Sequence, residues 1–464
     1  MSAARRLWRT ASCAVMGTML ALSGAAAAAD AVETTLGNGM RVIVKSDHRA
    51  PVVVSMVWYK VGSVDEVTGA TGVAHVLEHM MFKGTRSVPN GTFSRMIAAA
   101  GGRDNAFTSK DYTGYFQMLH KSQLELSLRL EADRMVNLVL APEEFAKELK
   151  VVMEERRLRT DDRPRAQVYE QLTAAAYVAH PYRNPIIGWM SDLESMRVEQ
   201  ARAFYDQWYA PNNAILVVVG DVDPQEVFAL ADKFFAGIAR KELPRRVSSE
   251  DPVQLGPKRI VVKAQAELPY LLMGYRVPTL RDPERDWESY ALEMLANVLS
   301  GGDAARLPRR LVRGERLANS ASAGYDGIGR GPGMFYLSGV PSPGRAVAEV
   351  EAALRRELQE IADQGVAQDE LKRIKAQAVA SHVYERDSMF FQARQIGSLE
   401  TAGLSHRTVD LYLDKLRAVT AEQVQQVARK YFVDDLLTVA TLDPQPLDAK
   451  RPAAAPPTGL RHAP

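Results

Sequence analysis

The chain has 464 residues, a single cysteine and a formal net charge of +2 at pH 7. This length is too great for one hydrophobic core and favours two or more domains. The charge is nearly balanced and no basic patch is interleaved with aromatic residues, which argues against a nucleic-acid-binding protein. The only cysteine, Cys13, lies in the N-terminal segment, so the rest of the chain can form neither a disulfide nor a thiolate metal site.

Residues 1–29 have the three parts of a secretory signal peptide. Arginines precede an apolar run, Ala11–Leu22, and an alanine-rich end leads to Asp30. We expect cleavage after Ala29 and an exported protein, periplasmic if the source is a Gram-negative bacterium. The apolar run is too short and too rich in Ala and Gly for a typical membrane span, so no stable span is expected after cleavage. The alternative is an uncleaved N-terminal anchor.

Two strands and a short helix are predicted next. The strands are the β-branched runs Arg41–Lys45 and Val52–Tyr59, which are bounded by turn residues. The helix lies between Thr71, which can cap its start, and Gly84, which can end it. Residues four apart on such a helix lie one turn above each other on the same face.

This short helix carries the first motif with chemical meaning. His75 and His79 are four residues apart, so their imidazoles can converge, and Glu78 is beside them. Two imidazoles and a nearby carboxylate suit a catalytic zinc ion, provided that a third ligand comes from elsewhere. The alternative is a histidine pair on a half-buried helix, with Glu78 as a solvated charge.

Two longer helices are predicted at Gln123–Val139 and Glu143–Arg159. In the second one, Glu148 and Glu155 are two turns apart and share a face with the apolar Val152. A buried carboxylate without a partner is costly, and a metal ion would remove that cost. The alternative is an ordinary charged helix whose glutamates pair with neighbouring lysines and arginines.

The two motifs together resemble those of the M16 zinc metallopeptidases, the family of pitrilysin, insulysin and the mitochondrial processing peptidase. The chain has His-x-x-Glu-His followed by Glu-x6-Glu, and the last glutamate lies 76 residues after the second histidine. The likeness covers residues 33–445 and is closest to the short, two-domain M16B branch. It implies a role for each of five residues: His75, His79 and Glu155 as zinc ligands, Glu78 as the catalytic base, and Glu148 as the carboxylate that orients a ligand.

The resemblance also implies an α+β fold of two homologous α/β domains, each with a mixed, mostly antiparallel sheet packed with helices. The sequence agrees, because the strands Arg259–Lys263 and Tyr270–Tyr275 and the helix Trp287–Ser300 repeat the plan of the first half. We therefore expect a signal peptide at 1–29, a catalytic zinc domain at 33–240, a linker at 241–257, an inactive repeat domain at 258–445 and a disordered tail at 446–464.

In the family, a strand at Asn105–Thr108 forms a sheet edge that accepts the substrate as an added strand. This likeness makes Asn105, Ala106 and Phe107 expected substrate contacts. The alternative is an ordinary hairpin with the alternating run Gly114–Leu119. His180 precedes a proline in a turn-rich loop and is expected to be structural.

The second half lacks the metal motif. Aligning Gly84 with Gly301 places Leu292, Leu295 and Ala296 where the first half has His75, Glu78 and His79. The family also uses an Arg and a Tyr of the second domain to bind substrate. The aligned positions here are Val312 and Asn319, and the nearby Arg313, Arg316 and Tyr325 leave a one-residue shift open.

The function implied is a zinc endopeptidase, with one Zn²⁺ per chain, that cleaves peptides or unfolded segments inside a closed chamber. Because the Arg and Tyr are missing at the aligned positions, we expect a homo- or heterodimer in which an M16-like subunit supplies them. The alternative is a non-catalytic structural or peptide-binding subunit of the same fold.

Overall fold

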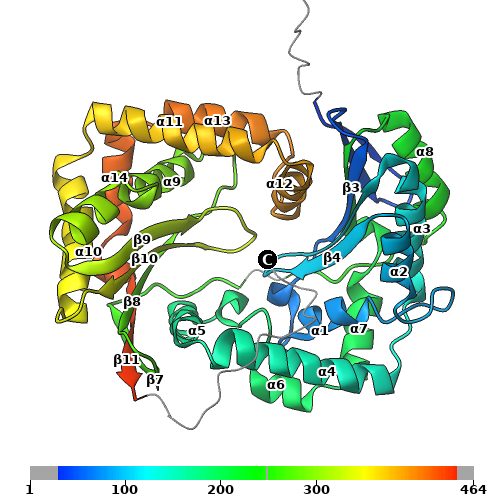
Figure 1. The fold of residues 1–464 in the computed structure, drawn as a ribbon, viewed down its shortest axis with the longest axis horizontal. Helices are drawn as coiled ribbons and strands as arrows, with labels where there is room; N and C mark the ends of the chain where they lie inside the picture. Colours follow the sequence, from blue (N-terminus) through cyan, green and yellow to red (C-terminus); the bar gives the residue numbers. More distant parts are fainter. Residues whose placement is uncertain (1–29, 247–248, 447–464) are drawn as a thin grey trace, which may run out of the picture.

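The computed structural model describes residues 30–246 and 249–446. The predicted signal peptide, and the predicted tail beyond its first residue, lie outside the described residues. The described chain forms two halves, each a sheet covered by helices, which lie side by side in Figure 1. Residues 241–246 and 249–257 form no helix or strand. The predicted domain boundaries themselves stay a prediction.

The sheet of the first half has six strands in the order β1-β2-β6-β3-β5-β4. These strands are β1 (Val32–Thr35), β2 (Arg41–Ser46), β3 (Val52–Tyr59), β4 (Arg103–Thr108), β5 (Thr113–His120) and β6 (Ala214–Gly220). Only β2 and β6 run parallel, and the other neighbours are antiparallel. The central β3 and β6 are rich in valine and almost fully buried, whereas β4 forms one edge of the sheet.

The sheet of the second half has the order β7-β11-β8-β10-β9 and repeats the succession β2-β6-β3-β5-β4. Its strands are β7 (Lys258–Gln265), β8 (Tyr270–Val277), β9 (Ala318–Asp326), β10 (Gly333–Pro341) and β11 (Leu437–Gln445). Again only one pair, β7 and β11, is parallel. The predicted fold class, two related halves with mixed and mostly antiparallel sheets, is confirmed.

Helices pack on both sheets. Those of the first half are α1 (Val73–Met80), α2 (Thr92–Ala99), α3 (Leu124–Asn137), α4 (Pro142–Arg156), α5 (Pro164–Ala176), α6 (Met190–Ser195), α7 (Val198–Trp208) and α8 (Pro224–Phe235). Those of the second half are α9 (Trp287–Ser300), α10 (Val347–Gln364), α11 (Gln368–Glu385), α12 (Met389–Thr401), α13 (Thr408–Ala418) and α14 (Ala421–Tyr431). The predicted helix Trp287–Ser300 has the observed bounds of α9.

Each half places one helix on the sheet of the other half. Helix α12 of the second half lies against β3 and β6, and α5 of the first half lies against β7, β8 and β11 (Figure 1). Ala393 and Ile396 of α12 join a buried cluster with Trp58, and Gly397 contacts the same indole so closely that a Cβ would lie 2.0 Å from Trp58 Cε2. The two halves therefore complete each other's hydrophobic cores.

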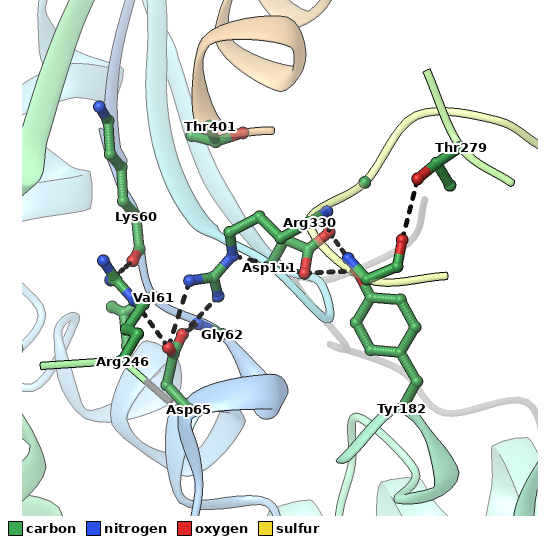
Figure 2. A network of polar contacts seen from close by, with 12 residues as sticks. Lys60, Val61, Gly62, Asp65, Asp111, Tyr182, Arg246, Thr279, Arg330 and Thr401 are labelled. Carbon is green, nitrogen blue, oxygen red and sulfur yellow. Dashed lines mark hydrogen bonds and ion pairs between the residues drawn. The ribbon is translucent and has the colours of Figure 1, made fainter. Parts of the chain in front are cut away.

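A polar network also joins the halves (Figure 2). The loop between β9 and β10 reaches the first half, where the guanidinium of Arg330 forms an ion pair with Asp65. The backbone N–H of Arg330 donates to Asp111 at 2.8 Å, and that of Gly331 donates to the hydroxyl of Tyr182 at 2.8 Å. The same hydroxyl donates to Asp111 at 2.6 Å. The turn after the edge strand β4 is thus fixed from the second half.

The buried carboxylate of Glu400, in α12, connects the halves through its ion pair with Arg41 of β2. It also accepts hydrogen bonds from the backbone N–H of His406 at 2.8 Å and from its ring. Burial raises the pKa of Glu400, but the hydrogen bonds from His406 and Arg41 outweigh that effect and lower it to about 2. Because this pKa lies below the ordinary value of 4.5, the stabilisation is present above about pH 4.5 and is lost as the pH falls toward 2.

We predict that Glu400→Gln lowers the free energy of unfolding by about 1–3 kcal/mol at pH 7, because a charge-assisted contact between the halves is lost. The difference from the wild type should narrow between pH 4.5 and pH 2, as measured by urea unfolding. Glu33→Gln is the control, since Glu33 also pairs with Arg41 but its side chain is 33% exposed. This substitution should lower the free energy of unfolding by less than about 1 kcal/mol. A Glu400→Gln difference that stays constant over this pH range would contradict the assignment.

Candidate metal centre and its cavity

Helix α1 is buried along its whole length and carries His75, Glu78 and His79. The backbone N–H groups at its start have a hydrogen-bond acceptor outside the helix. The buried Glu66 accepts those of Gly72 at 2.8 Å and Ala74 at 2.9 Å. Burial raises the pKa of Glu66 well above its ordinary value, and the two backbone hydrogen bonds oppose that increase. The start of helix α1 is therefore fixed from the preceding loop.

The prediction that Thr71 caps this helix is wrong. The helix starts after Gly72, whose φ of 88° lies in the left-handed region. The hydroxyl of Thr71 instead donates to Asp192 of α6 at 2.6 Å and accepts the N–H of Trp189 at 3.0 Å. A partner 121 residues away along the chain replaced the local cap that the sequence pattern favours.

Helix α4 packs on α1 and brings Glu148 and Glu155 to the histidines. Glu155 is fully buried, and its carboxylate oxygens lie 3.8 Å from His75 Nε2 and 3.4 Å from His79 Nε2. The Nδ1 of His79 lies 2.9 Å from Glu148 Oε1, which leaves Nε2 directed at Glu155. Glu148 also pairs with Lys83. The predicted ligands and the predicted orienting carboxylate are thus neighbours in the structure.

These three side chains fit a zinc ion. One donor atom each from His75, His79 and Glu155 lies within 4.8 Å of the others, and all three residues are buried. Tetrahedral ligands at about 2.0–2.1 Å from zinc lie roughly 3.3 Å apart, so the distances between Glu155 and the imidazoles need only a small contraction. Two imidazoles and one carboxylate are a donor set of catalytic zinc sites, which keep a fourth position open.

The electrostatics of the cluster also favour a cation. Burial lowers the pKa of His79, but hydrogen bonds with Glu148 and Glu155 outweigh it and raise the pKa to about 9. Burial raises the pKa of Glu155, whereas His79 and His75 lower it to about 2. The carboxylates therefore stabilise positive charge between them, and a bound metal would compete with the proton on His79.

Glu78 is 1% exposed and lies next to the ligand cluster. Burial raises its pKa to about 7, although His79 and the hydroxyl of Thr108 oppose the increase. Thr108, the last residue of β4, donates its hydroxyl to Glu78. A carboxylate with a pKa near neutrality can accept and release a proton at physiological pH.

A cavity of about 560 Å³ opens beside this cluster. It is lined by His75, Glu78, Ala106, Phe107, Thr108, Lys110, Glu155, Arg159, Thr160, Ala166, Tyr169, Glu170, Thr173, Arg183, Asn184, Pro185, Ile186 and Ile187. Of the three predicted contacts on β4, Ala106 and Phe107 line the cavity and Asn105 does not. All of these lining residues belong to the first half.

Several lining residues were not predicted. Arg159 and Thr160 lie in a π-helical turn, Arg157–Asp161, that continues α4. Such turns occur frequently at functional sites. Arg159 follows Glu155 by four residues, so its position on the same helix face could have been inferred from the sequence. The loop Arg183–Ile187 meets the site only through the tertiary fold, and no sequence signal pointed to it.

Among residues 249–446, none belongs to the lining of this cavity. Val312 packs beside the core of the second half and Asn319 is exposed on β9. The hydroxyl of Tyr325 donates to Pro278 O at 2.6 Å, and Arg313 donates to Asp303 O. The one-residue shift left open by the sequence therefore brings neither an Arg nor a Tyr to the described site.

The other aligned positions agree with the sequence analysis. Leu292, Leu295 and Ala296 are buried in the apolar core of the second half. Within residues 30–246 and 249–446, the cluster of His75, His79 and Glu155 is the one group found that could hold a metal ion. His180 lies outside it, and its Nδ1 accepts the N–H of Tyr182 at 3.1 Å.

We predict that Glu148→Gln weakens zinc binding by about 10- to 100-fold, because His79 loses the carboxylate that fixes its ring and raises its basicity. Glu154→Gln is the matched control on the same helix, since the Glu154 side chain is 58% exposed and pairs with Arg157. Competition with a chromogenic chelator measures both affinities. Equal zinc affinities of the two variants would contradict an orienting role for Glu148.

Comparison with known proteins gives consistent matches along both halves. Residues 41–189 match the model of the insulinase family (peptidase family M16), and residues 195–378 match that of the peptidase M16 inactive domain. The zinc protease PqqE of Helicobacter pylori is 32% identical over 418 residues, which cover 88% of this chain and 92% of that protein. An uncharacterized zinc protease of Mycobacterium leprae is 31% identical over 413 residues, covering 88% and 90%.

The fold comparison agrees. The crystal structure of a protease from Helicobacter pylori superposes with a TM-score of 0.85 at 31% identity, covering 89% of this chain and 100% of that one. In the described part of the chain, no helix has the length and apolar character that crossing a membrane requires. Together with the two family models, these matches show that the chain belongs to the insulinase family, peptidase family M16.

Proposed function

We propose that this protein is a zinc-dependent endopeptidase that cleaves peptides or unfolded segments. The observation that carries the proposal is the convergence of His75, His79 and Glu155 beside the buried Glu78. The names of the relatives, zinc proteases, support it. The cavity next to this cluster and the edge strand β4 offer a place for an extended chain.

In the proposed mechanism, His75, His79 and Glu155 would hold a zinc ion, which would supply Lewis-acid activation of water and of the substrate carbonyl. Glu78 accepts a proton from the attacking water and delivers it to the nitrogen of the leaving amine. The hydrogen bond from Thr108 holds the carboxylate of Glu78 in place. The edge of β4 pairs with the main chain of the substrate, which gives affinity with loose side-chain specificity.

We further propose that the chain acts as a homo- or heterodimer with an M16-like subunit. The described cavity receives no residue from the second half, and Val312 and Asn319 stand where the family has an Arg and a Tyr. A partner that supplies these two side chains would complete the site and close a chamber around the substrate. Such a chamber admits extended chains and excludes compact proteins.

The proposed location is outside the cytoplasm. It rests on the signal-like segment 1–29, which has basic, apolar and alanine-rich parts in the order of an export signal. In a Gram-negative source the protein would therefore work in the periplasm.

We predict that Glu78→Gln lowers kcat for a quenched fluorescent peptide by about 10²–10⁴-fold, because the proton acceptor is lost. Zinc content should stay near one per chain, measured by elemental analysis of the same preparation. Glu154→Gln should keep its activity. Loss of zinc in Glu78→Gln would make Glu78 a ligand and the roles assigned here wrong.

The non-catalytic alternative makes a different prediction for the wild type. A structural or peptide-binding subunit would bind peptides without cleaving them, even with zinc and a candidate partner added. Turnover by the zinc-loaded wild type that disappears with a chelator and returns with zinc supports the peptidase.

A further inference from the structure

The cavity beside the zinc ligands is lined by three cationic side chains that the proposed mechanism does not use. They are Lys110, Arg159 and Arg183. They come from three separate segments: the turn after β4, the π-helical turn after α4, and the short 3-10 helix Pro181–Arg183. Their convergence on one cavity is a feature of the tertiary fold.

Arg159 lies closest to the catalytic cluster. Its Nη1 is 2.7 Å from Glu155 Oε1, and its side chain is 37% exposed. A guanidinium has five N–H donors in a planar fork, so this single contact leaves donors for a second acceptor. Because Arg159 lines the cavity together with His75 and Glu78, that acceptor can belong to a substrate bound next to the zinc site.

Lys110 packs against aromatic faces. Its ammonium lies 4.8 Å from the ring centroid of Tyr182 and 5.8 Å from that of Tyr177. The structure shows no carboxylate within 4.0 Å of this ammonium in the described residues. Burial raises the pKa of Asp326 in β9 and the Lys110 ammonium opposes that increase, so a carboxylate of the second half is also within its electrostatic range. The adjacent Asp111 is bound by Arg330 and Tyr182 (Figure 2), so the turn that carries Lys110 is fixed.

Arg183 is the third cation of the lining. One of its N–H groups donates to Val178 O at 2.8 Å, and the residue is otherwise exposed. The remaining carboxylate of the wall, Glu170, is neutralised, because Arg156 donates to both of its oxygens at 2.8 and 2.9 Å. The lining therefore holds three cations and three carboxylates, Glu78, Glu155 and Glu170. Two of these carboxylates are already paired, Glu155 with Arg159 and Glu170 with Arg156, which does not line the cavity.

The other walls are mainly apolar, with Phe107, Ala166, Ile186 and Ile187 among them. Apolar walls exclude water and strengthen charge interactions inside the cavity. The volume is within the range of about 300–1,000 Å³ typical of ligand pockets. A cavity with apolar walls and cationic side chains in its lining suits a short side chain that ends in an anion.

We propose that this cavity is a carboxylate-binding subsite, in which Arg159 and Lys110 hold a carboxylate of the substrate close to the scissile bond. The inference rests on the proposed peptidase function and specifies its substrate class. An arginine fork and a lysine ammonium match the geometry and charge of a carboxylate. The carboxylate comes from an Asp or Glu side chain beside the cleaved bond, or from the free C-terminus of a short peptide.

The test uses the zinc-loaded Glu78→Gln protein, which holds substrate without turnover, and measures peptide binding by fluorescence anisotropy. Three otherwise identical peptides are compared: one neutral with an amidated C-terminus, one with an internal Glu and an amidated C-terminus, and one neutral with a free C-terminus. We expect one carboxylate-bearing peptide to bind at least about 10-fold more tightly than the neutral one. Which of the two it is identifies the source of the carboxylate.

Adding Arg159→Gln or Lys110→Gln should reduce this preference to about 3-fold or less, with zinc content checked in each protein. Arg157→Gln is the matched control, because Arg157 lies in the same turn but is 47% exposed and pairs with Glu154. Equal binding of all three peptides, or a preference that both variants keep, would overturn the subsite. The peptidase proposal predicts that the wild type also cleaves the neutral peptide. If the wild type cleaves it but the binding preference is absent, only the subsite proposal fails.

Discussion

The structure depends on the packing of α1 against α4, because this contact buries two imidazoles and three carboxylates. Burying a single unpaired charge costs several kcal/mol. Here Glu155 lies between His75 and His79, and Glu148 lies against the far side of the His79 ring. The charges are therefore arranged around a common centre, and a divalent cation at that centre would compensate two carboxylates at once. The same arrangement leaves Glu78 beside the centre with a pKa near neutrality.

The second half shows that the fold forms without these buried histidines and glutamates. It repeats the strand order of the first half, and α9 has Leu292, Leu295 and Ala296 at the aligned positions, all buried among apolar side chains. Hydrophobic packing is thus sufficient to hold the helix on its sheet. Each half also depends on the other, since α5 and α12 each cover the sheet of the opposite half. The second half supports the first half by this exchange and by the Arg330 network, which fixes the turn after the edge strand (Figure 2).

Much of this could be predicted from local patterns. The β-branched run Val52–Tyr59 predicted the central strand β3, and the four-residue spacing of His75 and His79 predicted that their imidazoles converge. Glu155 was assigned as the third ligand through the resemblance to the M16 family. Features that depend on long-range contacts could not be predicted. Thr71 has a favourable cap composition, but Asp192 and the left-handed Gly72 determine its conformation. No periodic pattern in the sequence indicates that α5 and α12 each cover the sheet of the opposite half, or that residues 183–187 reach the cavity. These contacts form only when the two halves pack together.

The central claim is that one zinc ion is held by these three side chains, with Glu78 outside its coordination shell. Anomalous diffraction at the zinc absorption edge, from crystals of the zinc-loaded protein, tests it most directly. The account predicts one peak per chain at about 2.0–2.2 Å from His75 Nε2, His79 Nε2 and an oxygen of Glu155. A peak at another place in the chain, or one coordinated by Glu78 in place of Glu155, would contradict it.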